Sequence, residues 1–222
     1  MSYQHDDIFE NRKQFQLDRL ILFSDAVFAI AITLLVIEIK VPTLETDTEK
    51  ELINSLLHKI PEFIAFIISF AVIGQFWTNH HRLFGYVKDF TPGLMWLNLH
   101  MLFWIALMPF STHLNMEHGT SDITWIWYCL NLTFIGLALY FMWRYIGKHR
   151  HLCTMSHDKL FMQFAYRRAL IVSAIFFLGA LMVMLPFDFL RWPARFVFFL
   201  IFPAMIFLRK SYEKKANKKA AM

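Results

Sequence analysis

The chain has 222 residues, of which 57% are hydrophobic and only 18% carry a charge, and 25 of them are phenylalanine. This composition excludes an ordinary soluble domain, which needs far less apolar surface. The net charge is +5, and much of it lies in a basic C-terminal segment. Beside an anionic bilayer such a segment is more simply a determinant of topology than a nucleic-acid-binding tail, so we expect no nucleic acid partner.

Six apolar stretches approach or exceed the length of about 20 residues that a helix needs to span a bilayer. They cover residues 19–40, 59–78, 93–114, 123–146, 167–187 and 191–209. No phosphate-binding loop, cysteine cluster or low-complexity linker interrupts them, so we expect a single domain over residues 1–222. It would comprise an N-terminal segment, 1–18, the six spans and a basic tail, 210–222. The sequence thus predicts an all-α integral membrane protein with six transmembrane helices.

The first stretch, residues 19–40, carries Arg19, Ser24 and Asp25 near its start. A carboxylate within hydrocarbon costs roughly 2.5–3.5 kcal/mol on insertion scales, so Asp25 is expected to face protein groups or water. The stretch is too long for the apolar part of a signal peptide and no small-residue cleavage site follows it. An ionisable residue in this position indicates a functional site.

An apolar stripe follows on the same helix. Ile30, Leu34 and Ile37 recur at i, i+4 and i+7 and therefore share one face. Asp25 is turned roughly 140° away from Ile30, and Thr33 lies about 60° from Ile30, on the flank of the stripe. The helix can therefore present an apolar wall on one side and a polar anchor on another. From the pattern alone, helix packing is the simpler explanation of the stripe.

The spacing of Arg19, three variable residues and then Phe23, Ser24 and Asp25 resembles a family signature. It is similar to that of the potassium channels of endolysosomes and their bacterial relatives, in which the motif opens the first transmembrane helix. The resemblance covers nearly the whole chain. It implies a potassium-selective channel with passive conduction, in which potassium is the permeant ion, no cofactor is needed and no enzymatic activity is present.

The resemblance also implies which residues line the pore. In the family, the first helix lines a central pore, and bulky apolar residues five, nine and twelve positions after the motif aspartate form the constriction. Those positions are Ile30, Leu34 and Ile37 here, and Thr33 matches a threonine of the same filter region. Bacterial relatives with one six-helix unit per chain form tetramers, so the resemblance implies a homotetramer in a cell membrane, the inner membrane of a bacterium.

The second stretch ends in Phe76-Trp77-Thr78-Asn79-His80-His81. An aromatic residue followed by paired histidines is also a feature of the family, and this end lies on the same side of the membrane as Asp25. We expect a structural polar network that satisfies the buried acid and orients the pore helix. Its members are the motif residues Arg19, Phe23, Ser24 and Asp25 together with Trp77 and one of His80 and His81, with His81 favoured. Asn98 and Asn131, within later spans, are expected to mediate helix contacts.

The basic residues indicate the topology. On one side of the six spans lie most of the lysines and arginines; the other side has only Lys40, Lys50, Lys59, Arg191 and Arg195. By the positive-inside rule both termini are cytoplasmic. In the first external connection, Thr48 is placed to cap a helix that begins near Glu49. Pro203, inside the last stretch, is expected to kink it.

Two other classes of function remain as alternatives. A cation-coupled or proton-coupled secondary transporter would show an inverted repeat or helices broken at the bilayer midplane, and the sequence reveals neither. His80, His81, His100 and Asp25 offer zinc ligands, but adjacent histidines point to different helix faces and no HExxH spacing is present. Ser24 and Ser69 have no base at a diagnostic spacing, so we expect neither a catalytic nor a metal site.

Overall fold

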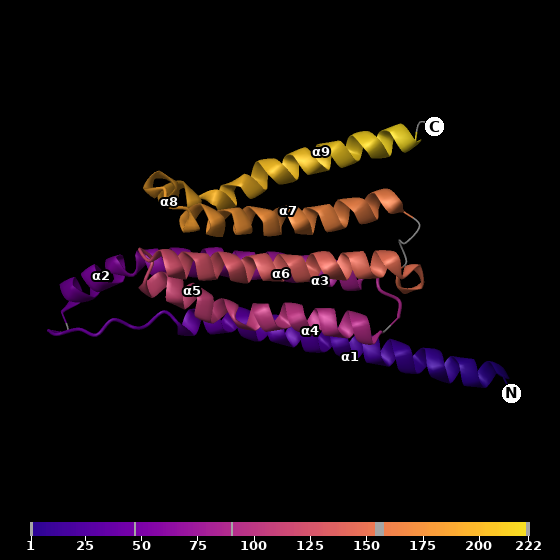
Figure 1. Cartoon of the computed structure of the whole chain (residues 1–222). Helices are drawn as coiled ribbons and strands as arrows, with labels where there is room; N and C mark the ends of the chain where they lie inside the picture. Colours follow the sequence, from indigo (N-terminus) through magenta and orange to yellow (C-terminus); the bar gives the residue numbers. More distant parts are fainter. Residues whose placement is uncertain (1, 47, 90, 154–157, 221–222) are drawn as a thin grey trace.

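The computed structural model describes residues 2–46, 48–89, 91–153 and 158–220, and these residues are almost entirely helical (Figure 1). The helices are α1 (Ser2–Ile37), α2 (Glu49–His58), α3 (Ile60–Phe84), α4 (Pro92–Ala106), α5 (Met108–Glu117), α6 (Asp122–Lys148), η1 (Arg150–Leu152), α7 (Lys159–Met184), α8 (Asp188–Ala194), η2 (Val197–Leu200) and α9 (Ile201–Ala220). The prediction of an all-α fold is confirmed.

Five segments are long and apolar enough to cross a membrane: Arg12–Ile37, Ile60–Phe84, Pro92–Glu117, Asp122–Lys148 and Lys159–Met184. The pair Asp188–Ala194 and Val197–Lys218 is bent by 59° and makes a sixth if it counts as one span. The protein is therefore an all-helical membrane protein with five to six spans. The spans are longer than predicted, since α1 continues from the N-terminal segment without a break and α9 runs on into the basic tail.

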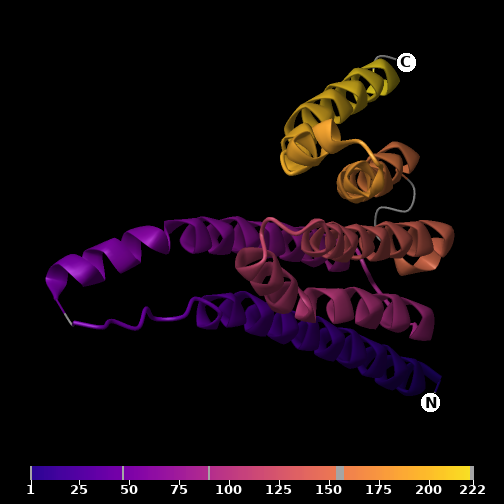
Figure 2. The same ribbon diagram turned by 60° about the vertical axis from the view of Figure 1, so that its left-hand side comes forward.

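The helices lie side by side in successive layers. The helix α6 packs against α7, α4 and α5, while α1 packs against α3, α4 and α5, and α9 packs against α7. Both views place α1 and α9 on opposite sides of the bundle, with α6 and α7 between them (Figures 1 and 2). The start of α1 and the end of α9 lie at the same end of the bundle, as an even number of crossings requires.

Prolines explain two interruptions of the helices. The third span is divided between α4 and α5 at Leu107, because Pro109, the second residue of α5, has no N–H to continue the ladder. The predicted kink at Pro203 is wrong: the bend lies between Ala194 and Val197, just after Pro193. Pro203 is the third residue of α9. The N–H groups of a first helical turn have no partner within the helix, so the proline removes no helical hydrogen bond there.

The connection between α1 and α3 contains the capped helix that the sequence predicts. The Thr48 hydroxyl accepts a hydrogen bond from the Glu51 N–H at the start of α2. The Glu51 carboxylate turns back to accept from the N–H groups of Glu45 and Thr46 at 2.7 and 2.9 Å, and from the Thr46 hydroxyl. The Thr46 hydroxyl first, and then these N–H groups, hold the pKa of the Glu51 carboxyl below its usual value. The connection therefore contains an ordered, capped helix.

The contact between α6 and α7 depends on Gly136, at which an added Cβ would overlap the Ser173 hydroxyl and lie 3.4 Å from the Ser173 Cβ. That hydroxyl donates to the Ala169 carbonyl at 3.0 Å. Gly136→Ala should therefore push the two helices apart and destabilise the protein by about 1–3 kcal/mol, seen as a lower thermal unfolding temperature in detergent. The matched control is Gly74→Ala in α3, where an added Cβ meets nothing within 4 Å and stability should be unchanged or higher. Equal stability of the two variants would show that α6 and α7 do not approach so closely.

Candidate pore-lining helix and its polar anchor

One face of α1 is packed against the rest of the bundle. Ser24, Phe28, Ala31 and Leu35 follow one another at helical spacing, and none is more than 2% exposed. They face α3, α4 and α5, which are the neighbours of α1. This face fixes the rotation of α1 about its own axis, and with it the direction in which every other α1 side chain points.

The opposite face of α1 is left uncovered by its own chain. Phe23, Ile30, Leu34 and Ile37 are 51%, 58%, 40% and 70% exposed, although all four side chains are large and apolar. Thr33 lies on the same side, and its hydroxyl donates to the carbonyls of Ala29 and Ile30 at 2.9 Å each. In a membrane helix such a face contacts lipid, a second copy of the chain or a pore. The structure thus places Phe23 with the apolar stripe rather than with the polar residues.

Asp25 is half-buried between these two faces. The Trp77 indole N–H, from α3, donates to Asp25 Oδ1 at 2.9 Å. His81 packs its ring against Trp77, with 5.5 Å between the ring centroids, and among the described residues it makes no ion pair with Asp25. The Asp25 carboxylate is therefore held by the Trp77 indole, and His81 contacts Trp77 rather than the carboxylate.

Arg19 also lies apart from Asp25. Its guanidinium is 5.7 Å from the centre of the Phe15 ring, and no ion pair between Arg19 and Asp25 occurs in the described part of the chain. The six residues that separate Arg19 from Asp25 place them roughly 9 Å apart along the helix and about 120° apart around it. An Arg-to-Asp pair within α1 is therefore geometrically unfavourable, which the prediction of a single network overlooked.

A separate buried chain of hydrogen bonds joins three helices. Asn98, from α4, donates to Ser24 Oγ at 2.8 Å, and Ser24 in turn donates to the Leu20 carbonyl at 2.7 Å. On its other side the Asn98 Oδ1 lies 2.7 Å from His80 Nε2. Since an amide oxygen only accepts, this contact requires the proton to be on Nε2. The chain connects α1, α4 and α3 through side chains that are at most 1% exposed.

The structure therefore divides the predicted network in two. Ser24 and His80 belong to the buried chain through Asn98, while Asp25, Trp77 and His81 form a more exposed group beside it. The histidine that reaches the core is His80 and not the favoured His81, because consecutive residues are turned by 100° and only one of them faces inward. The ring of His80 is enclosed by Phe28 and Phe84, with centroids 5.4 and 4.5 Å away.

A second buried polar cluster links α3, α5 and α6. Thr112 donates to Ser69 at 3.0 Å, and Asn131 and Trp127 donate to Ser111 at 2.6 and 2.9 Å. Hydroxyl and amide groups at such positions hold transmembrane helices together. Asn131 therefore has the helix-contact role expected from the sequence, while Ser69, Ser111 and Thr112 were missed because isolated hydroxyl residues in an apolar stretch carry little signal.

The segment that follows α1 is tied to α5 by charged groups. Lys40 Nζ lies 2.9 Å from Glu117 Oε1, and this hydrogen bond holds the pKa of the Lys40 ammonium above its usual value. His113 lies between two carboxylates, 3.3 Å from Glu117 Oε1 and 3.3 Å from Glu38 Oε2. In the part of the chain that the structure describes, no group of three or more His, Cys, Asp or Glu side chains is placed to hold a metal ion.

The sequence and the fold were compared with those of known proteins. Residues 19–109, which include the motif, α3 and most of the third span, match the family model described as the endosomal/lysosomal potassium channel TMEM175. The chain belongs to the TMEM175 family. The predicted family is thereby confirmed, as is the prediction of an ion-channel family rather than an enzyme.

Two bacterial potassium channels resemble this chain in sequence. A potassium channel of Chryseobacterium sp. (strain P1-3) is 47% identical over 94 residues, which cover 42% of this chain and 46% of that protein. A potassium channel of Streptomyces collinus is 38% identical over 138 residues, or 60% of this chain and 66% of that protein. The chain thus matches about half to two thirds of the length of these curated relatives.

The fold agrees over a longer range than the sequence. The crystal structure of a lysosomal potassium-selective channel TMEM175 homolog from Chamaesiphon minutus superposes with a TM-score of 0.69 at 27% identity. The match covers 89% of this chain and 98% of that one. The bundle of α1 to α9 is therefore the architecture of a TMEM175 homolog.

Proposed function

We propose that this chain forms a potassium channel whose pore is lined by α1. The observation that carries the proposal is the pair of unlike faces on α1. One face is packed to 2% exposure or less, and the other leaves Ile30, Leu34 and Ile37 uncovered. Membership of the TMEM175 family supports it, since the bacterial relatives are described as potassium channels.

The pore requires several copies of the chain. The helix α1 lies on one side of its own bundle, and a single helix cannot enclose a channel (Figures 1 and 2). A closed ring of copies about a symmetry axis would cover the uncovered face of each α1 with its neighbours. We propose a homotetramer, with both termini cytoplasmic and the assembly in the inner membrane of a bacterium.

The proposed constriction is apolar. Rings of Ile30, Leu34 and Ile37 would narrow the pore and gate it by dewetting. Thr33, on the flank, has its hydroxyl proton engaged by carbonyls of its own helix, so that its oxygen lone pairs are available to a cation. The preference for potassium over sodium is proposed on the family alone.

The polar groups behind α1 are proposed to act as its anchor. The buried chain from Ser24 through Asn98 to His80 holds α1 on α4 and α3, and Asp25 with Trp77 adds a second tie. Both ties hold the side of α1 away from Ile30, so they would keep the apolar stripe turned toward the axis. In this role neither Asp25 nor His80 touches the permeating ion.

Ion flux in reconstituted liposomes tests the proposal. Under an imposed potassium gradient, we expect a fast current that reverses near the potassium equilibrium potential and does not require a proton gradient. Protein-free liposomes are the control for leak. A slow, saturable flux, or one that needs a proton gradient, would support the alternative of a coupled transporter. Absence of any flux from an intact oligomer would contradict the channel proposal.

A further inference from the structure

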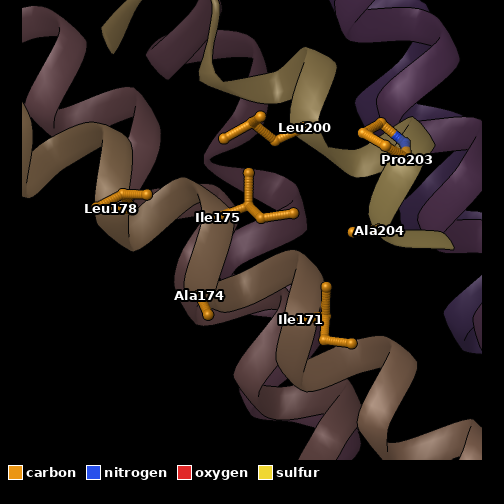
Figure 3. A pocket seen from close by; sticks show the side chains of 7 residues that line it. All are labelled: Ile171, Ala174, Ile175, Leu178, Leu200, Pro203 and Ala204. Carbon is orange, nitrogen blue, oxygen red and sulfur yellow. The ribbon is translucent and has the colours of Figure 1, made fainter. Parts of the chain in front are cut away.

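A long groove separates α7 from α9 on the side of the bundle away from α1. One section of it has a volume of about 430 Å³ and is lined by apolar residues. From α7 come Ile171, Ala174, Ile175 and Leu178, and facing them are Leu200, at the end of η2, and Pro203 and Ala204, in α9 (Figure 3). The small side chains of Ala174 and Ala204 leave the groove open where larger residues would close it.

A second and much smaller hollow, of about 20 Å³, lies between the same two helices toward the start of α7 and the end of α9, and its lining is partly polar. This second section is lined by Leu160, Gln163, Phe164 and Arg167 of α7 and by Leu208, Ser211, Tyr212 and Lys215 of α9. On each helix the lining residues of both sections recur at intervals of three or four, which is one continuous helical stripe. The rings of Phe164 and Tyr212, with centroids 4.8 Å apart, hold the two helices together at this end.

In the part of the chain that the structure describes, no carboxylate pairs with the positive charge of the polar section. Arg167 and Lys215 are exposed and face the groove from opposite helices, and no ion pair of either is found among the described residues. The neighbouring Arg168 turns away and donates to Asn79 of α3, whereas Arg209 pairs with Glu213 at 2.8 Å. Two unpaired cations beside Ser211 and Tyr212 are complementary to a phosphate group at the membrane surface.

The spacing of the two sections matches one leaflet of a bilayer. Arg167 and Leu178 are eleven residues apart on α7, which is about 16 Å along the axis. Half of the hydrocarbon core is about 15 Å thick. A phosphate held at Arg167 would therefore place an acyl chain along the apolar section as far as the middle of the membrane.

We propose that the groove between α7 and α9 binds one anionic phospholipid of the cytoplasmic leaflet. Arg167 and Lys215 hold the phosphate, and one acyl chain lies against Ile171, Ile175 and Ala204. The inference rests on the orientation given in the proposed function, with the start of α1 and the end of α9 cytoplasmic, but not on conduction. Because α9 lies opposite α1 in the bundle, the groove faces the surrounding lipid and not the proposed pore.

Native mass spectrometry of the full-length, delipidated oligomer tests the site with phosphatidylglycerol as the anionic probe and phosphatidylcholine as the neutral one. We expect phosphatidylglycerol to bind more tightly. The double variant Arg167→Gln/Lys215→Gln should weaken that binding by about tenfold or more, since both basic residues that attract the anionic headgroup are lost. The control Lys210→Gln/Lys214→Gln removes two exposed cations of the same helix outside the groove and should leave binding unchanged.

Two further measurements separate the parts of the site. Ala204→Trp fills the apolar section without changing charge, so it should weaken phosphatidylglycerol binding while the oligomer stays intact on size exclusion. Inorganic phosphate at millimolar concentration should not displace the bound lipid. If the two charge variants weaken phosphatidylglycerol binding equally, the lipid binds to a general basic surface. If inorganic phosphate displaces the lipid, the site binds the headgroup but not an acyl chain. Either result overturns the proposal. Lipid binding is measured independently of ion flux. A protein that binds the lipid but does not conduct would therefore contradict only the proposed channel function.

Discussion

Replacement of Ile30 by asparagine should increase potassium conductance and weaken the preference of the channel for potassium over sodium. Ile30 is 58% exposed on the uncovered face of α1, and in the proposed tetramer its side chains form a narrow apolar ring. An amide at this ring binds water and removes the cost of wetting the constriction, so that hydrated ions of both kinds pass more easily. The measurement is the reversal potential in mixed potassium and sodium solutions, together with the flux rate per oligomer.

The matched control for this substitution is Val36→Asn. Val36 is 53% exposed on the same helix but is turned by about 120° from Ile30, so its amide would not enter the proposed constriction. The control variant should conduct and select ions as the unmodified channel does. If Ile30→Asn also leaves conductance and selectivity unchanged, the pore is lined by another part of the molecule.

The spans and the two faces of α1 could be predicted from the sequence because each has a strong physical cause. A bilayer requires a long apolar helix, so the crossings stand out in the composition. The stripe of Ile30, Leu34 and Ile37 follows from helical geometry, and the motif beside it indicated the pore-facing role that is proposed here. The bend in the last span was predicted at the wrong proline, because Pro193 and Pro203 look alike in sequence. What separates them is the start of α9 at Ile201, which decides which of the two prolines interrupts a ladder of helical hydrogen bonds.

The pairing of Ser24 with Asn98 could not be predicted, because spacing along α1 does not reveal which neighbouring helix lies against Ser24. Both faces of a membrane helix are apolar, so the periodicity that selects a buried face in soluble proteins is weak. One signal was available: Ile73, Phe76, His80 and Leu83 recur at helical spacing and are among the buried residues of α3. That stripe includes His80 and excludes His81.

The buried chain leads to the second large effect. Asn98→Leu should lower the stability of the protein severely, because in a site that is at most 1% exposed it leaves the His80 Nε2–H without an acceptor and Ser24 Oγ without a donor. Each buried polar group that loses its partner costs about 1–3 kcal/mol. We expect a large fall in the thermal unfolding temperature and loss of the assembled oligomer at temperatures that the unmodified protein survives.

The triple variant Ser24→Ala/His80→Phe/Asn98→Leu separates the loss of hydrogen bonds from the change of shape. It removes every polar member of the chain at once, so no donor or acceptor is left unpaired, and it should recover most of the stability that Asn98→Leu loses. A triple variant that is no more stable than the single one would mean that packing around Asn98, and not its hydrogen bonds, holds α1 in place.

The variant Asp25→Asn distinguishes a role of Asp25 as an anchor of α1 from a role as a ligand of the permeating ion. Asp25 is only half-buried and its described partner is the Trp77 indole at 2.9 Å, and asparagine still offers an oxygen to that N–H. The stability of the Asp25→Asn variant should therefore fall less than that of Asn98→Leu. The variant should also keep its preference for potassium, because the carboxylate is turned roughly 140° from the apolar stripe. Thermal unfolding and the potassium-to-sodium permeability ratio should be measured on the same preparation. A stable Asp25→Asn channel that no longer prefers potassium would place the carboxylate in the ion path and refute the rotation of α1 on which the pore-lining residues depend.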